Sequence, residues 1–182
     1  RGAYSYEYER LMPGMDAWEA GARLREMIPA IRGLWNGNYA HDGEYYKFPE
    51  STSTPKPIQS SGPPIWIAAR DPNSHEFAVE NNCNVQVTPL WQDYEEVEVL
   101  IARFRAAQTK CQNQYQSKIM LLQHTFVSKT EDELEHAAKL FSKFYSHFGA
   151  WFKNERPVDQ ALMKKLSDDE IKALEMYSPA IM

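Results

Sequence analysis

Short, continuous hydrophobic runs alternate with amphipathic segments through the middle of this chain. The clearest run is Ile-Trp-Ile-Ala-Ala at positions 65–69, and a run that is apolar at every position is typical of a parallel strand covered on both faces. Similar runs predict two more strands, and apolar residues at helical spacing predict helices between and after them. In chain order the prediction is strand 65–69, helix 74–82, strand 85–90, helix 94–111, strand 119–127 and helix 131–152. This alternation with short connections indicates parallel βαβ units and an α/β fold.

The flanking regions have a different pattern. Asp16 can cap a helix over residues 17–35, and His-Asp-Gly at 41–43 predicts a hairpin turn. Five prolines between positions 49 and 64 indicate extended surface chain, so residues 38–64 are interpreted as a hairpin and proline-rich insertion. Thr130 followed by Glu133 predicts a capping box at the start of the last long helix. Residues 153–182 are interpreted as a variable helical tail, and residues 1–182 as one domain.

Two sheet architectures produce such an alternation, a doubly wound sheet and a (β/α)₈ barrel. The chain has no G-x-G-x-x-G after a strand and no P-loop, which favours the barrel. A complete barrel needs about 250 residues, whereas this chain has 182 and three predicted core strands. Three parallel strands cannot close, and they leave two edges open to association. The chain begins at Arg1 rather than at Met, and we expect it to be part of a larger barrel.

Charge and composition exclude several classes of partner. The net charge is −5 and basic runs are absent, which argues against nucleic acid. Apolar runs never approach 18 residues, so we expect no membrane span. Cys83 and Cys111 have neither CxxC nor metal-ligand spacing, which favours a reduced cytoplasmic setting without a metal site.

The segment after the first core strand carries the strongest chemical signal. Residues 70–74, Arg-Asp-Pro-Asn-Ser, supply a turn, candidate N-caps and a proline suited to the first helical turn. A strand that ends at a helix N-terminus presents unpaired N–H groups. The segment is therefore a candidate site for an anion or a cofactor phosphate.

Several motifs, in their order and spacing, resemble those of bacterial luciferase-like flavin monooxygenases. They cover most of residues 1–127 and comprise Arg-Gly-Ala-Tyr at 1–4, Ile-Arg-Gly-Leu-Trp-Asn-Gly at 31–37, Gly-Glu-Tyr-Tyr-Lys-Phe at 43–48, Pro-Lys-Pro-Ile-Gln at 55–59 and Pro-Pro-Ile-Trp-Ile-Ala-Ala at 63–69. The resemblance implies a (β/α)₈ barrel of which this chain holds about strands 5 to 7. It implies a cofactor, reduced FMN or in some branches a deazaflavin, that a partner flavin reductase supplies. It also implies a homo- or hetero-dimer.

The same resemblance assigns four cofactor-binding positions. Arg1 matches the family arginine that approaches the cofactor phosphate, and Arg70, Asp71 and Ser74 match the phosphate-binding loop. For Arg70 an ion pair with Asp71 or Glu76 is the alternative, and for Ser74 the alternative is a plain helix cap. Asp71 departs from the small hydroxyl residue expected there, and a carboxylate beside a phosphate is unfavourable unless it points away. Glu19 stands roughly where luciferases have a second phosphate-contacting arginine.

Other candidate side chains have ordinary structural interpretations. His124 is expected in the last predicted strand as a hydrogen-bonded core residue, and His75 as a solvated helix residue that could help to bind an anion if charged. His41 is interpreted as a turn residue. Trp91 and the tyrosines at 4, 6 and 8 are candidates for contact with flavin or for packing. The catalytic residues stay unknown, because in relatives the acid/base histidine comes from the early strands.

The expected function is part of a flavin-dependent monooxygenase that uses reduced FMN and molecular oxygen to oxidise a small organic substrate. The flavin supplies the oxygen chemistry, so few catalytic side chains are needed. The chain as given is expected to be inactive alone. Two alternatives stay open: a non-catalytic flavin-binding protein with a reduced barrel, and a deazaflavin-dependent oxidoreductase. The identity of the substrate is not encoded in these motifs.

Overall fold

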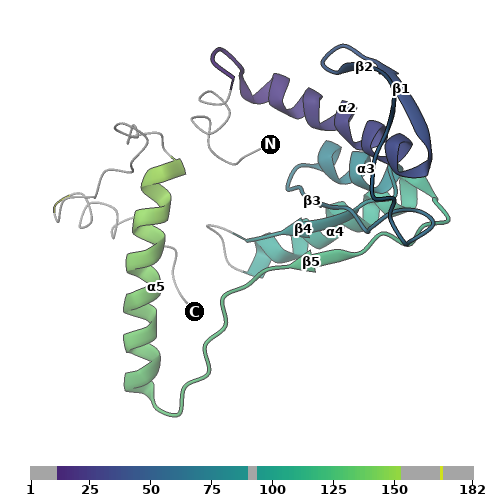
Figure 1. The fold of residues 1–182 in the computed structure, drawn as a ribbon. Helices are drawn as coiled ribbons and strands as arrows, with labels where there is room; N and C mark the ends of the chain where they lie inside the picture. Colours follow the sequence, from purple (N-terminus) through teal and green to yellow (C-terminus); the bar gives the residue numbers. More distant parts are fainter. Residues whose placement is uncertain (1–11, 90–93, 153–168, 170–182) are drawn as a thin grey trace. The chain divides into compact units, whose positions relative to one another are not determined.

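A computed structural model describes residues 12–89, 94–152 and 169, with side chains described up to position 144 and at Asp169. The described chain falls into two compact units, one of residues 17–88 and 96–122 and the other including residues 12–16 and 123–152. The first unit holds a helix, a hairpin and an α/β layer (Figure 1). Its elements are α2 (Ala17–Asn36), β1 (Asn38–Asp42), β2 (Lys47–Thr52), β3 (Trp66–Ala68), α3 (Pro72–Glu80), β4 (Asn84–Val87), α4 (Tyr94–Cys111) and β5 (Ile119–Leu121).

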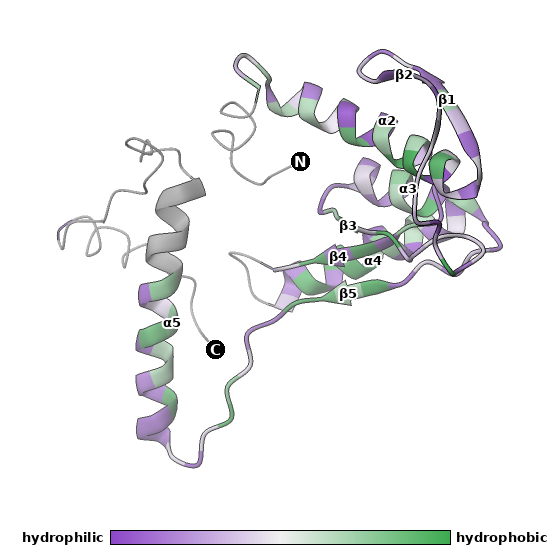
Figure 2. Cartoon of the chain, in the orientation of Figure 1, coloured by the Kyte–Doolittle hydropathy of each residue, from purple (hydrophilic) through white to green (hydrophobic). Residues whose placement is uncertain are grey.

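The core sheet is parallel, in the order β3-β4-β5, as the alternation of the sequence predicts. Ile67, Val85 and Val87 point to one face and join the buried core cluster with side chains from α3 and α4. Figure 2 shows hydrophobic colouring along β5, whereas β4, Asn-Val-Gln-Val, alternates hydrophilic and hydrophobic residues. On the opposite face Trp66 and Met120 are 39% and 44% exposed. The three strands are therefore covered by helices on one face.

The last core strand is shorter than predicted. The sequence pattern predicts a strand over residues 119–127, whereas β5 ends at Leu121. Its neighbour β4 ends at Val87, and the last bond between them runs from the Leu122 N–H to the Val87 carbonyl at 2.9 Å. Beyond that point the ladder has no partner in β4, so the chain leaves the sheet. His124 consequently lies outside the strand in which it was predicted.

The insertion packs against α2 through two anchors. Glu26 of α2 accepts hydrogen bonds from the N–H groups of Glu44, Tyr45 and Tyr46 at 3.1, 3.0 and 2.8 Å, in the turn between β1 and β2. Lys56, in the proline-rich segment, donates to the carbonyls of residues 34 and 37 at 2.7 and 2.8 Å, at the C-terminal end of α2. An ammonium group there satisfies helix carbonyls and complements the helix dipole. The insertion is thereby held to α2, whose Ile28 belongs to the core cluster of the β3-β4-β5 layer.

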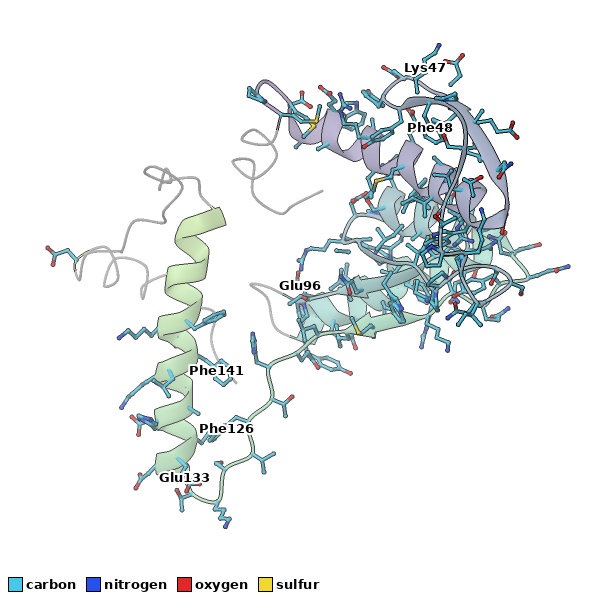
Figure 3. All side chains as sticks on the ribbon, in the orientation of Figure 1. Lys47, Phe48, Glu96, Phe126, Glu133 and Phe141 are labelled. Carbon is cyan, nitrogen blue, oxygen red and sulfur yellow. The ribbon has the colours of Figure 1, made fainter. Side chains whose placement is uncertain are left out.

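The second unit is dominated by α5 (Glu131–Phe152). The predicted Thr130 cap is confirmed, since the Glu133 N–H donates to Thr130 Oγ1 at 3.2 Å. The Glu133 carboxylate accepts from the Lys129 N–H at 2.8 Å, one residue before the N–H group that a standard capping box uses. The His124 ring packs against Phe141 and Phe144 at centroid distances of 5.2 and 5.9 Å. Phe126 points toward the helix from the same segment (Figure 3). His124 therefore belongs to an aromatic cluster on α5.

Within the part of the chain that the structure describes, no helix is long and apolar enough to cross a membrane. The division into two units leaves the single-domain interpretation of residues 1–182 a prediction. Residues 153–182 are outside the described part apart from Asp169, and so the helical tail also stays a prediction.

Candidate functional site

The turn between β3 and α3 adopts the predicted strand–turn–helix geometry. Asp71 is the N-cap of α3, with extended backbone angles of φ −83° and ψ 155°, and Pro72 occupies the first turn. The Asp71 carboxylate accepts from the Ser74 N–H at 3.0 Å and from the Ser74 hydroxyl at 2.6 Å. Aspartate at the N-cap and proline at the next position are the residues that a helix start favours. Local interactions therefore cap this helix start.

The Asp71 carboxylate already accepts a hydrogen bond from a backbone N–H group at the start of α3, where a bound anion would also lie. Partial burial alone would raise the pKa of this carboxyl, but the hydrogen bonds from the Ser74 side chain and backbone outweigh it and keep the pKa below its ordinary value. Asp71 is therefore ionised at neutral pH, at the position where a bound anion would interact with the helix dipole. An incoming phosphate has to share or displace this contact.

Arg70 connects the ends of two strands and a helix. Its guanidinium donates through Nη1 to the Thr88 carbonyl just after β4, and through Nη2 to Glu96 Oε1 in the first turns of α4. The Arg70 side chain is 40% exposed and that of Glu96 is 9% exposed. Figure 3 shows Glu96 at the end of the sheet where α4 begins. The expected alternative partners of Arg70, Asp71 and Glu76, are both engaged elsewhere.

Lys110 of α4 takes the carboxylate of Glu76, at a distance of 2.7 Å between Nζ and Oε2. This pair links α3 to α4 at a second, more exposed place, since the Lys110 side chain is 63% exposed. These two ion pairs connect α4 to the preceding strand–helix segment, one at the β3–α3 turn and one on the surface.

Two further side chains donate hydrogen bonds to backbone carbonyl groups just after β3. His75 Nε2 lies 3.0 Å from the Ala69 carbonyl oxygen, and Arg103 Nη1 donates to the Arg70 carbonyl oxygen at 2.7 Å. His75 is fully buried and packs edge-on against Phe104, which corrects the expectation of a solvated residue. Burial chiefly lowers its pKa, so His75 is neutral at pH 7, carries its proton on Nε2 and does not supply a positive charge for an anion.

The remaining sequence candidates do not join this turn. Arg1 and Trp91 and the three tyrosines near the N-terminus are outside the described residues. Glu19 pairs with Arg23 one helical turn later on α2, at 2.7 Å. His41 lies in β1, 3.0 Å from Glu26 Oε1. In the described ranges no cluster of three or more His, Cys, Asp or Glu residues could hold a metal ion.

Sequence reasoning missed Glu96 and Arg103. One signal could have found them: Glu96, Leu100, Arg103 and Phe104 follow the i, i+4, i+7, i+8 spacing of one helix face. Leu100 and Phe104 are core residues. Charged side chains are rarely buried without a partner, so a carboxylate and a guanidinium on the buried face of a predicted helix predict buried partners of opposite charge.

The donors around the turn suit an oxyanion such as a cofactor phosphate. Arg70 has five N–H groups and uses two of them in the contacts above. The Ser74 hydroxyl and the helix start lie on the same turn. The Asp71 carboxylate competes with a phosphate for these donors, because it already accepts hydrogen bonds from Ser74. The residue set therefore fits a phosphate, with Asp71 as an internal competitor.

The sequence of this chain is similar to those of known proteins. The family model of the luciferase-like monooxygenases matches residues 1–181. A curated relative, the oxygenase component of a flavin-dependent trigonelline monooxygenase from Acinetobacter baylyi, is 58% identical over all 182 residues, which make up 51% of its length. An uncharacterized protein, y4vJ from Sinorhizobium fredii, is 27% identical over 135 residues, covering 73% of this chain and 38% of that protein.

The fold is also found in a solved structure. The crystal structure of monooxygenase RslO1 from Streptomyces bottropensis superposes with a TM-score of 0.61 at 22% identity, over 96% of this chain and 54% of that one. The predicted α/β fold, a portion of a luciferase-like barrel, is thus confirmed. This chain spans about half the length of the curated relatives it matches. The chain belongs to the luciferase-like monooxygenase family.

Proposed function

We propose that this chain is part of the oxygenase component of a two-component flavin-dependent monooxygenase. In this proposal a separate flavin reductase supplies reduced FMN, and molecular oxygen oxidises a small organic substrate. The family membership supports the reaction class. The relative that is 58% identical over the whole of this chain is named an oxygenase component, which supports the separate reductase.

The observation that carries the proposal is the geometry of the β3–α3 turn. The turn that contains Arg70, Asp71 and Ser74 lies at the carboxyl end of a parallel strand. Barrel enzymes bind their ligands at this end of the strands. We assign the phosphate end of the flavin to this turn, with Ser74 and Arg70 as donors, and include Arg1 as a further cofactor-binding residue. When bound, the flavin supplies the activation of oxygen.

The chain's own residues hold and orient the cofactor in this scheme. The Asp71 carboxylate limits the affinity of the turn for a dianion because two negative charges then share one helix start. Modest affinity suits a cofactor that is reduced on another protein, since such a flavin has to enter and leave at each cycle. We also propose a cytoplasmic location and a dimer of like or related subunits.

The substrate proposal rests on the same relative. Trigonelline is the substrate in the name of the protein that is 58% identical over this whole chain, and it is the first compound to test. The test uses the intact protein with FMN, a flavin reductase and NAD(P)H, and it follows oxygen consumption and oxidised product together. We expect trigonelline to increase product formation, and we expect the increase to need both FMN and the reductase.

The controls separate the open alternatives. FMN binding, measured by fluorescence quenching, without product from any substrate would indicate a non-catalytic flavin-binding protein. Turnover with a reduced deazaflavin in place of FMN would assign the other cofactor. If neither flavin binds at tens of micromolar protein, the proposed function is wrong.

A further inference from the structure

Glu96 is an unusual residue for the position it holds. It is 8% exposed, among core side chains of α4 such as Val97 and Leu100. A carboxylate is rarely buried to this extent unless it is paired. The Arg70 guanidinium is such a partner.

The pair joins segments that are distant in sequence. Arg70 follows β3, Thr88 follows β4, and Glu96 lies on α4, so a single guanidinium spans all three. Arg103, also from α4, donates to the Arg70 carbonyl at 2.7 Å. Both the side chain and the backbone of Arg70 are therefore held by α4.

We propose that Glu96 is a positioning residue for the flavin-phosphate turn. It fixes the Arg70 guanidinium across the strand ends, and through Arg70 it fixes the start of α3, where Asp71 and Ser74 lie. This inference rests on the proposed function for its ligand. A carboxylate cannot itself attract a phosphate, so any gain that Glu96 gives to phosphate binding has to act through Arg70.

The sign of the Glu96 effect distinguishes positioning from simple electrostatics. If charge alone mattered, Glu96→Gln would remove a nearby negative charge and strengthen the binding of FMN. If Glu96 positions Arg70, the same substitution weakens FMN binding. The two explanations predict opposite directions from one nearly isosteric change.

The experiment measures FMN binding to the intact protein by fluorescence quenching, in the parent and in Glu96→Gln, Arg70→Gln and the double variant. We expect each single variant to raise the Kd by about tenfold, the loss of roughly one charge-assisted hydrogen bond. The double variant is expected to bind about as weakly as Arg70→Gln alone, because Glu96 acts through Arg70. Riboflavin, which lacks the phosphate, is the ligand control.

Glu76→Gln is the matched protein control. It removes the same charge from the neighbouring Lys110 pair, which also joins α3 to α4, and we expect its Kd for FMN to stay within about twofold of the parent. Glu96→Gln variants that bind FMN as tightly as the parent, or more tightly, would overturn the proposal.

A second measurement needs no flavin. Hydrogen exchange of the peptide over residues 69–77 reports whether the turn is held in the apo protein. We expect faster exchange in Glu96→Gln and Arg70→Gln, and parent-like exchange at this turn in Glu76→Gln. Unchanged exchange in Glu96→Gln would refute the positioning role. A parent protein that binds no flavin, yet shows the expected exchange pattern, would refute the proposed function and leave the role of Glu96 in holding the turn established.

Discussion

At the scale of single residues, the direction of one hydrogen bond decides what the β3–α3 turn offers a ligand. The Ser74 hydroxyl donates to the Asp71 carboxylate at 2.6 Å. An ionised carboxylate only accepts hydrogen bonds, so in this arrangement the hydroxyl hydrogen of Ser74 is committed to it. The carboxylate also adds a negative charge at the helix start. Asp71 therefore opposes phosphate binding both by charge and by taking a donor.

Substituting Asp71→Asn separates these two effects from the structure of the helix. Asparagine caps helices as well as aspartate does, so α3 should remain intact. Its amide can donate to Ser74 Oγ, which frees the hydroxyl hydrogen for a phosphate. We expect FMN to bind a few-fold more tightly to Asp71→Asn, a gain of about 1 kcal/mol, in a fluorescence titration of the intact protein.

Riboflavin binding is the control for the Asp71 prediction. It should be the same in the parent and in Asp71→Asn, because the effect acts on the phosphate. An Asp71→Asn variant with unchanged or weaker FMN binding would show that the phosphate does not meet this turn.

At the scale of elements, the docking of the hairpin on α2 depends on one carboxylate. Besides the three N–H groups of the turn, Glu26 receives a hydrogen bond from His41 Nε2 at 3.0 Å. Gly43 lies so close to Glu26 and His41 that a Cβ at this position would collide with both side chains. The turn sequence is thus fitted around Glu26, and we expect the packing of β1 and β2 on α2 to fail when this carboxylate is neutralised.

Acid should therefore weaken the attachment of the hairpin. Desolvation alone would raise the pKa of Glu26, but the hydrogen bonds from Tyr45, Tyr46 and His41 outweigh it and lower the pKa. A carboxyl whose pKa is depressed by folding stabilises the fold at pH values above its unfolded pKa. This stabilisation is lost as the pH falls through the lower pKa of the folded state.

We expect Glu26→Gln to lower the denaturation midpoint at pH 7, and we expect the difference from the parent to shrink as the pH falls through the lowered pKa of the parent carboxyl. Urea denaturation between pH 3 and 7, followed by circular dichroism, measures the difference. Glu19→Gln on the same helix is the control, because Glu19 pairs with Arg23 within α2. A Glu26→Gln difference that stays constant across this pH range would contradict the prediction.

The elements also show what the sequence could and could not predict. Helices α4 and α5 have the predicted bounds, because their hydrophobic periodicity and the Thr130 cap are local signals. The strand expected over 119–127 was too long, since the length of a ladder depends on the neighbouring strand. Asp71 as a cap was predictable from adjacent residues, whereas Glu96 as the partner of Arg70 depends on a contact over 26 positions.

At the scale of the whole molecule, the sheet exposes strand edges and apolar side chains that a closed barrel would cover. Within the described residues, β3 and β5 are each hydrogen-bonded to β4 on one side. Trp66 and Met120 are exposed on the face away from the helices. Exposed strand edges next to apolar side chains promote association with further strands.

We predict that the 182-residue chain, purified by itself, associates through this sheet. Sedimentation velocity should show a mass that rises with concentration. Met120→Lys should reduce the association, because a charge on an edge strand opposes pairing with a second strand. Ile58→Lys provides the matched control, since Ile58 is fully exposed in the proline-rich segment and outside the sheet. A chain that stays monomeric at all concentrations, or that responds equally to both substitutions, would show that the sheet is not the associating surface.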